Sequence, residues 1–220
     1  MRELTSEEKK VLLMSTLFKG MTEKSLCHAL CFYRADIRHY EKGESIKNST
    51  DLLNCFGFVL SGIVQVCMDE LDGSHMVMAT VERGNSFGES LCFLEKESPV
   101  YITAVTAADI LCMDCGNFRK ASGKEDTEML LGFTSMLAER TLRMNERIQI
   151  LSKHSIREKL KAMFSGYPGA SEGKTFEIPM NRDDMASYLG TDRSSLSREL
   201  SRMKKEGLID YYKNSFRING

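Results

Sequence analysis

The sequence predicts an α+β protein with an N-terminal antiparallel β-roll of the jelly-roll type, a long helix and a C-terminal winged helix-turn-helix. Three stretches predict this class. Residues 34–113 are short apolar alternations that glycines interrupt, which is typical of an antiparallel roll. Residues 125–151 carry apolar side chains at heptad spacing. Residues 181–207 read as two helices joined by a tight turn.

The composition is that of an ordinary globular protein. The 220 residues suffice for two modest domains, and 42% of them are hydrophobic and 28% charged. No apolar run approaches the roughly 20 residues of a membrane helix, and the first ten residues do not resemble a signal peptide. We therefore expect a cytoplasmic protein without a membrane partner, in which the seven cysteines are reduced by default.

Two short helices are expected before the roll, from Thr5 to Phe18 and from Thr22 to Phe32. Cys27 and Cys31 lie one helical turn apart in the second helix, a spacing that could supply half of a metal site. Because no second pair of suitable residues lies nearby, we interpret them as buried structural cysteines and expect no metal.

The roll is expected to contain several short strands. Its most β-prone runs are Phe58 to Leu60, Ile63 to Met68, His75 to Val81 and Tyr101 to Met113. Asp72 and Gly73 predict a tight hairpin turn between the second and third of these runs.

Within the roll, the segment FGESLCF (87–93) is a candidate effector site. Gly88 lets the backbone approach a ligand closely, and the amides of its neighbours, including that of Ser90, can point inward. Glu89 could accept hydrogen bonds from a sugar hydroxyl. The alternative interpretation is a loop glycine beside a surface glutamate.

The long helix carries a seam with alternating spacings of four and three residues. The seam consists of Leu130, Thr134, Leu137, Thr141, Met144, Ile148 and Leu151. Its length favours a parallel contact between the helices of two copies over a helix that merely covers the sheet. The two threonines weaken such a zipper, which suits a helix that shifts or touches a ligand.

The C-terminal helices have clear start and stop signals. Asn181 can cap the first helix and Asp192 the second. Gly190 falls at the turn between them, where a positive φ is required, and Gly207 can end the second helix.

The second helix has two unlike faces. Its apolar face consists of Leu196, Leu200 and Met203. The opposite face carries Arg193, Ser194, Ser197, Arg198 and Ser201, and Lys204 and Lys205 continue it. Small side chains allow close approach to a DNA major groove, and arginine can form two hydrogen bonds with guanine. The alternative is the solvated face of an ordinary helical hairpin.

Two β-prone runs after this helix predict a wing, from Leu208 to Tyr212 and from Ser215 to Ile218. Lys213 and Arg217 could reach the phosphate backbone, or could simply be exposed polar residues. From Ser152 onward there are 13 Lys and Arg against 9 Asp and Glu, a balance of +4. The remainder carries 17 against 22, a balance of −5, so the basic part is C-terminal.

The order of these features resembles the Crp/Fnr family, the cyclic-AMP receptor protein and its fumarate–nitrate regulator relatives. Phe87-Gly88-Glu89 and RSSLSREL (193–200) carry the resemblance. It implies a cyclic-nucleotide-binding-like sensor roll at 1–116, a dimerisation helix at 117–152 and a DNA-binding domain at 153–220. It further implies a homodimer on a two-fold-symmetric double-stranded DNA operator, a small-molecule effector, and contact of the loop 166–174 with RNA polymerase.

Two positions depart from the family pattern. Ser194 stands where many relatives carry a glutamate, which predicts a different operator preference. The family also pairs the cyclic phosphate with an arginine about ten residues after Glu89, but residues 98–101 read SPVY. We therefore expect an effector other than cyclic AMP held by that arginine contact. Thr141 falls near the helix segment that meets the ligand in relatives.

Two alternatives remain open at this point. Cys112 and Cys115 have CxxC spacing and could form a thiol-based redox sensor. The chain could instead be a ligand-binding module whose C-terminal hairpin grips a protein partner. No nucleophile–base pair, HExxH or phosphate-binding loop motif is visible, so we expect no catalytic residues and no enzyme activity.

Overall fold

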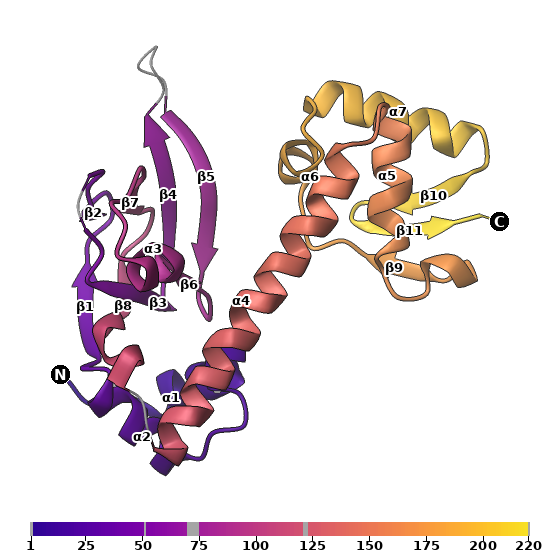
Figure 1. Ribbon diagram of the computed structural model, residues 1–220. Helices are drawn as coiled ribbons and strands as arrows, with labels where there is room; N and C mark the ends of the chain where they lie inside the picture. The colour runs from indigo at the N-terminus through magenta and orange to yellow at the C-terminus, as the bar shows by residue number, and fades with distance from the viewer. Residues whose placement is uncertain (1, 51, 70–74, 121–122, 220) are drawn as a thin grey trace. The chain divides into compact units, whose positions relative to one another are not determined.

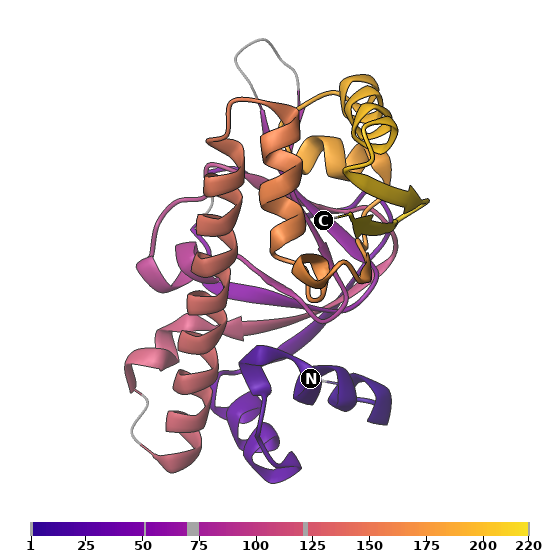
Figure 2. The same ribbon diagram turned by 90° about the vertical axis from the view of Figure 1, so that its right-hand side faces the viewer.

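The computed structural model describes residues 2–50, 52–69, 75–120 and 123–219. Two compact units contain them, Met1–Leu137 and Ala138–Gly220, and the boundary between the units lies within one long helix, α4 (Lys124–Leu151). The predicted class is confirmed, with an antiparallel roll, a long helix and a C-terminal helix-turn-helix with a wing (Figures 1 and 2).

Two helices open the first unit, α1 (Ser6–Met14) and α2 (Glu23–Phe32). Thr5 and Glu8 form a capping box at the start of α1. The helix predicted to run to Phe18 breaks at Ser15, which is extended, and a 3₁₀ turn follows, η1 (Thr16–Phe18).

The predicted burial of the two cysteines of α2 is wrong, because Cys27 and Cys31 are both exposed. The helix buries Leu26, Ala29 and Leu30 instead, and each cysteine follows one of these buried positions by a rotation of about 100°.

The roll consists of two four-stranded antiparallel sheets, in the orders β1-β8-β3-β6 and β2-β7-β4-β5. The strands are β1 (Asp36–Tyr40), β2 (Ser45–Lys47), β3 (Cys55–Ser61), β4 (Ile63–Asp69), β5 (His75–Glu82), β6 (Ser86–Phe87), β7 (Tyr101–Ala104) and β8 (Ala108–Asp114). A short helix, α3 (Glu89–Leu94), follows β6.

The run predicted as one strand from Tyr101 to Met113 is two strands in different sheets. The chain turns at residues 105–107, where the amides of Val105 and Thr106 donate to the carbonyl of Ile63. The predicted turn at Asp72 and Gly73 lies outside the described residues; the flanking strands β4 and β5 pair in antiparallel register up to Asp69 opposite His75.

Alternating residues of β3 and β8 face two different cores. The core between the sheets contains Val59, Val64, Val81, Phe87, Ile102, Ala104, Ala108, Ile110 and Cys112. The other face packs on the helices through Phe56, Phe58, Leu60, Leu111 and Met113. Gly57 leaves room for the ring of Phe87, which a Cβ at this position would overlap.

The part of α4 in the first unit buries Met129, Phe133 and Met136 in the helix-facing core. Gly132 lies on the same part of the helix, directly against the backbone of η1. A Cβ at Gly132 would overlap the carbonyl oxygen of Leu17, so this position requires the absence of a side chain.

The second unit continues from α4 with a three-helix core and a small sheet of order β10-β11-β9. Its elements are α5 (Ile156–Ser165), η3 (Ala170–Glu172), β9 (Thr175–Glu177), α6 (Arg182–Tyr188), α7 (Arg193–Lys205), β10 (Ile209–Tyr212) and β11 (Ser215–Ile218). Ser155 caps α5 with a capping box to Glu158. Strand β9 adds a third strand to the two predicted strands of the wing.

Replacing Gly132 by alanine is expected to destabilise the protein by about 1–3 kcal/mol, because the added methyl group forces η1 away from α4. At an exposed helical position the same change would stabilise by roughly 1 kcal/mol. Ser135→Ala, at an exposed position three residues further on, is the control and should be neutral or slightly stabilising. Urea unfolding followed by circular dichroism measures both; a Gly132→Ala variant more stable than the parent would contradict this account.

Candidate functional site

The two helices of the helix-turn-helix begin as predicted. The Asn181 side-chain oxygen accepts hydrogen bonds from the amides of Asp183 and Asp184, at 2.8 and 2.9 Å. The Asp192 carboxylate accepts from the amide of Ser195 at 2.8 Å. The hydrogen bond from the Ser194 hydroxyl, followed by the one from the Ser195 amide, holds the pKa of Asp192 well below its usual range.

The turn between the helices depends on Gly190, whose φ is +59°. A Cβ there would lie 3.2 Å from a methyl group of Leu151. The Lys159 ammonium donates to the carbonyl of Leu189, the last residue before the turn, at 2.9 Å. The predicted glycine turn is therefore confirmed, and a lysine of α5 satisfies the carbonyl at the end of α6.

The faces of α7 are as predicted. Leu196, Leu200 and Met203 are buried in the core of the second unit. A shallow groove runs over the opposite face and is lined by Ser197, Arg198, Ser201, Arg202 and Lys205. Arg202 was not among the predicted site residues, although its spacing of four residues from Arg198 places it on the same face.

The two predicted base-reading arginines are exposed but held in place. Arg193, with 64% of its side chain exposed, pairs with Asp183 of α6 at 2.9 Å. Arg198 donates to the hydroxyl of Ser195 at 2.9 Å and to the carbonyl of Ser194 at 3.4 Å. Both guanidinium groups therefore lie along the outward face of α7.

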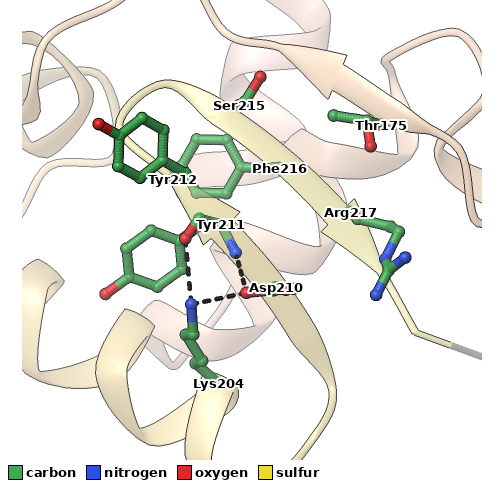
Figure 3. Close-up of a pocket in the computed structure, with 8 residues that line it drawn as sticks. All are labelled: Thr175, Lys204, Asp210, Tyr211, Tyr212, Ser215, Phe216 and Arg217. Atoms are coloured by element: carbon green, nitrogen blue, oxygen red, sulfur yellow. Dashed lines mark hydrogen bonds and ion pairs between the residues drawn. The ribbon is translucent and has the colours of Figure 1, made fainter.

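Lys204 differs from the prediction, because it turns away from this face toward the wing. Its ammonium lies 2.6 Å from a carboxylate oxygen of Asp210 and donates to the carbonyl of Tyr211 at 3.2 Å. Figure 3 shows both contacts beside the Tyr211 ring. The lysine thus ties the end of α7 to β10.

The wing turn is at Lys213, whose φ of +51° places it in the left-handed region. The Arg182 guanidinium donates to the Lys213 carbonyl at 2.6 Å and lies 5.1 Å above the ring centre of Phe216. The start of α6 therefore supports the wing turn, and the side chain of Lys213 remains exposed.

Arg217 lies at the other end of β11 from the wing turn. It is opposite Asp210 on β10 and opposite Thr175 on β9. These three side chains line the outer hollow of the wing together with Ser215 (Figure 3). Arg217 is thus exposed, as its predicted role requires, but it is a neighbour of Asp210 and not part of the wing tip.

A charged network fixes α7 on α5. Arg157 donates to Glu199 at 2.6 Å and to Glu206 at 2.7 and 3.0 Å, and Arg202 donates to Glu206 at 3.1 Å. The hydrogen bonds from Arg157 and then Arg202 lower the pKa of Glu206. Both carboxylates are therefore committed to arginines of the same unit.

In the candidate effector segment, Glu89 is not a surface residue, so the alternative interpretation of this segment is wrong. Gly88 has a φ of +79° and precedes α3, and Glu89 is completely buried. The Ser86 hydroxyl lies 3.4 Å from a carboxylate oxygen of Glu89 and 3.1 Å from the sulfur of Met136. Ser90 is exposed. Gly88 and Glu89 therefore form an inward-facing segment, whereas the Ser90 side chain points outward.

Residues 98–101, where the family pattern would place the phosphate-binding arginine, form a local hydrogen bond. Ser98 is buried, and its hydroxyl donates to the carbonyl of Val100 at 2.7 Å. Lys96, the nearest cation in the sequence, is exposed. Thr141 is exposed on α4 in the second unit.

The alternative of a redox pair formed by Cys112 and Cys115 does not hold. A disulfide joins Cys115 to Cys92 of α3, so the expectation that all thiols are reduced is wrong as well. Cys112 lies on the opposite side of the β8 backbone and contacts Cys55 of β3. CxxC spacing at the end of a strand places the two sulfurs on different faces, because side chains alternate.

Comparison with known families decides what this arrangement is. A model described as a Crp-like helix-turn-helix domain matches residues 158–219, and a cyclic nucleotide-binding domain model matches residues 37–124. The chain belongs to the Crp/Fnr family. This Crp/Fnr protein is accordingly a DNA-binding transcription regulator with a cyclic-nucleotide-binding-like sensor domain.

Characterised relatives match most of the chain. The nitrogen fixation regulation protein FixK of Bradyrhizobium diazoefficiens is 27% identical over 179 residues, 78% of this chain and 73% of that protein. The cyclic AMP receptor protein of Thermus thermophilus is 25% identical over 203 residues, 89% of this chain and 88% of that protein.

Solved structures share the fold at lower identity. The Thermus thermophilus catabolite activator protein has a TM-score of 0.51 and 22% identity, covering 93% of this chain and 94% of that one. The c-di-GMP responsive regulator CLP of Xanthomonas campestris has a TM-score of 0.57 and 17% identity, covering 90% of this chain and 100% of that one.

Among the described residues of the Crp/Fnr protein, no helix is long and apolar enough to cross a membrane.

Proposed function

We propose that this Crp/Fnr protein binds a two-fold-symmetric operator as a homodimer and inserts the outward face of α7 into the major groove. The observation that carries the proposal is the division of α7 into a buried apolar face and an exposed face of arginines and small hydroxyls. The base-contacting candidates are Arg193, Ser194, Ser197, Arg198 and Ser201. In this proposal the Crp/Fnr protein acts by binding DNA in the cytoplasm and not as an enzyme.

The chemistry of these side chains divides the contacts into two kinds. Arg193 and Arg198 can each donate two hydrogen bonds to guanine O6 and N7, which gives base discrimination. Ser194 can donate to or accept from either base of a pair, so it reads the sequence more loosely than a longer side chain would. Arg193 is paired with Asp183, and Arg198 is hydrogen-bonded to Ser195. These contacts already restrict both arginine side chains, so binding in the DNA major groove costs them little further conformational entropy.

Phosphate contacts would come from exposed cations that flank this face. We assign these contacts to Lys213 at the wing turn and to Arg202 and Lys205 further along α7. Arg217 is the weaker candidate, because Asp210 lies directly opposite it on the neighbouring strand. These contacts make affinity fall with salt but carry no sequence information.

The homodimer proposal rests on the seam of α4. Met144 and Ile148 are 59% and 60% exposed, and the other seam positions of the second unit, Thr141 and Leu151, are exposed as well. A row of exposed apolar residues at heptad spacing is what a parallel coiled coil of two copies would bury. Two recognition helices would then address half-sites about 34 Å apart.

We assign a separate role to each of three segments of the chain. Residues 1–116 sense a small molecule near Gly88 and Glu89, residues 117–152 pair the two copies, and residues 153–220 bind DNA. The loop 166–174, which contains η3, is the surface we assign to RNA polymerase contact. Thr141, on the seam of α4, would respond to the effector.

Arg198→Ala is expected to weaken operator binding by about 1–3 kcal/mol and to relax the preference for guanine at one position of each half-site. Fluorescence anisotropy with a duplex selected from a random pool measures the change. Lys161→Ala is the control, because Lys161 is an exposed cation on α5 of the same unit. Wild-type affinity in Arg198→Ala would contradict the assignment of the reading face.

Ile148→Asp is expected to convert the homodimer to a monomer, because it places a charge in the seam where two copies meet. Leu142→Asp is the matched control: Leu142 is 63% exposed but lies off the seam. Analytical ultracentrifugation distinguishes the two, and a dimeric Ile148→Asp variant would show that the copies meet elsewhere.

Cyclic AMP is expected to give no binding heat at micromolar concentration, because residues 98–101 offer no arginine for its phosphate. Isothermal titration calorimetry with cyclic AMP and cyclic GMP tests this. Micromolar binding of either nucleotide would mean that other donors, such as the backbone amides after Gly88, hold the phosphate.

A further inference from the structure

A cluster of thiols and cations lies on the inter-sheet face of the roll, apart from the Gly88–Glu89 segment, and its Arg38 side chain is 54% exposed and lies 3.5 Å from Asp36. Arg38 and Tyr40 of β1, Cys55 of β3 and Cys112 of β8 occupy alternating positions that face the space between the two sheets. Lys47 of β2 faces them from the other sheet, close enough to act on Cys55. Cys55 is partly exposed, whereas Cys112 is buried.

The strand register brings the two sulfurs together. Cys112 lies opposite Gly57 of β3, and Cys55 is two residues before that glycine on the same face of the sheet. Cys55 and Cys112 are therefore diagonal neighbours. The two thiols are close enough to share a hydrogen bond. Cys115 cannot be the partner of Cys112, because it is bonded to Cys92.

The surroundings favour a thiolate at Cys55. The hydrogen bond with Cys112, followed by the positive charges of Arg38 and Lys47, lowers the pKa of Cys55 to about 7, while burial and Asp114 act in the opposite direction. The same hydrogen bond and burial raise the pKa of Cys112. The cations Arg38 and Lys47 therefore favour Cys55, the less buried of the two cysteines, as the thiolate of the pair.

Together these contacts form a thiol pair with divided roles. We propose that Cys55 is a peroxide-reactive thiol and that Cys112 resolves its oxidised form to a disulfide. The Cys55 thiolate attacks one oxygen of the peroxide, the O–O bond breaks, and hydroxide leaves, giving a sulfenic acid. Cys112 then attacks the Cys55 sulfur; the S–O bond breaks and water leaves with the Cys112 proton. Both sulfurs are oxidised and the peroxide is reduced; an external dithiol reverses the reaction.

This disulfide would change the shape of the roll. Diagonal neighbours across antiparallel strands have Cα atoms roughly 7–8 Å apart, whereas a disulfide spans about 4.4–6.8 Å. Closing the bond therefore requires β3 to shift against β8. Gly57, two residues after Cys55, pairs with Phe87, the residue before Gly88, so the shift reaches the segment that opens α3.

The first experiment is peptide mapping of the full-length protein after stoichiometric hydrogen peroxide, with Cys27 and Cys31 replaced by serine because both are exposed. We expect a Cys55–Cys112 cross-link that a dithiol reverses. In Cys112→Ser the reaction should stop at a sulfenic acid on Cys55, which dimedone traps. Cys67→Ser, which removes another buried roll thiol, should leave the cross-link intact. Free thiols at Cys55 and Cys112 after treatment would overturn the proposal.

The second experiment needs no oxidation. Iodoacetamide alkylation of Cys55, followed by mass spectrometry against pH, should show a midpoint near 7. At pH 7 the thiolate fraction should be roughly fifteenfold that of an ordinary thiol of pKa about 8.5, and alkylation should be a few-fold faster, because a thiolate of lower pKa is a weaker nucleophile. Arg38→Gln should move the midpoint upward and slow the reaction. A midpoint at 8.5 or above in the parent protein would overturn the proposal. Both readouts are independent of DNA binding, so they can fail while the proposed function stands.

Discussion

Burial of one apolar stripe of α7 is the interaction on which the DNA-binding surface depends. Leu196, Leu200 and Met203 repeat at helical spacing and are buried in the core of the second unit. Because the helix is rigid, burying that stripe leaves the arginines and serines no position except the outside. Arg157 then holds the same helix on α5 through two glutamates, so the rotation of α7 is fixed by packing and charge together.

In the roll, likewise, the face of the strand on which a residue lies decides what its side chain contacts. The even positions of β3 pack on the helices and the odd positions face the second sheet. This alternation separates Cys112 from Cys115 and places Cys55 beside Cys112. It also lets Phe87 fill the space over Gly57, which couples the interior of the roll to the backbone of Gly88. The chemistry of the sensor is therefore set by which face each strand residue occupies.

Local signals in the sequence were sufficient to locate the two helices and the turn of the helix-turn-helix. Asn181, Asp192 and Gly190 act through neighbours within four residues, so their roles follow from spacing alone. The roll depends on pairings between distant residues. The division of residues 101–113 between two sheets, the burial of Glu89 and the Cys92–Cys115 bond all require knowledge of which strands and helices meet. The same limit explains Lys204, whose partner Asp210 belongs to the wing.

The measurement that tests the account most directly is methylation interference on a duplex enriched from a random pool by the full-length protein. Dimethyl sulfate modifies guanine N7 in the major groove and adenine N3 in the minor groove. The account predicts interference at guanine N7 in two half-sites about one helical turn apart, where two copies of α7 enter the major groove. Failure to enrich any duplex, or interference confined to adenine N3, would contradict it.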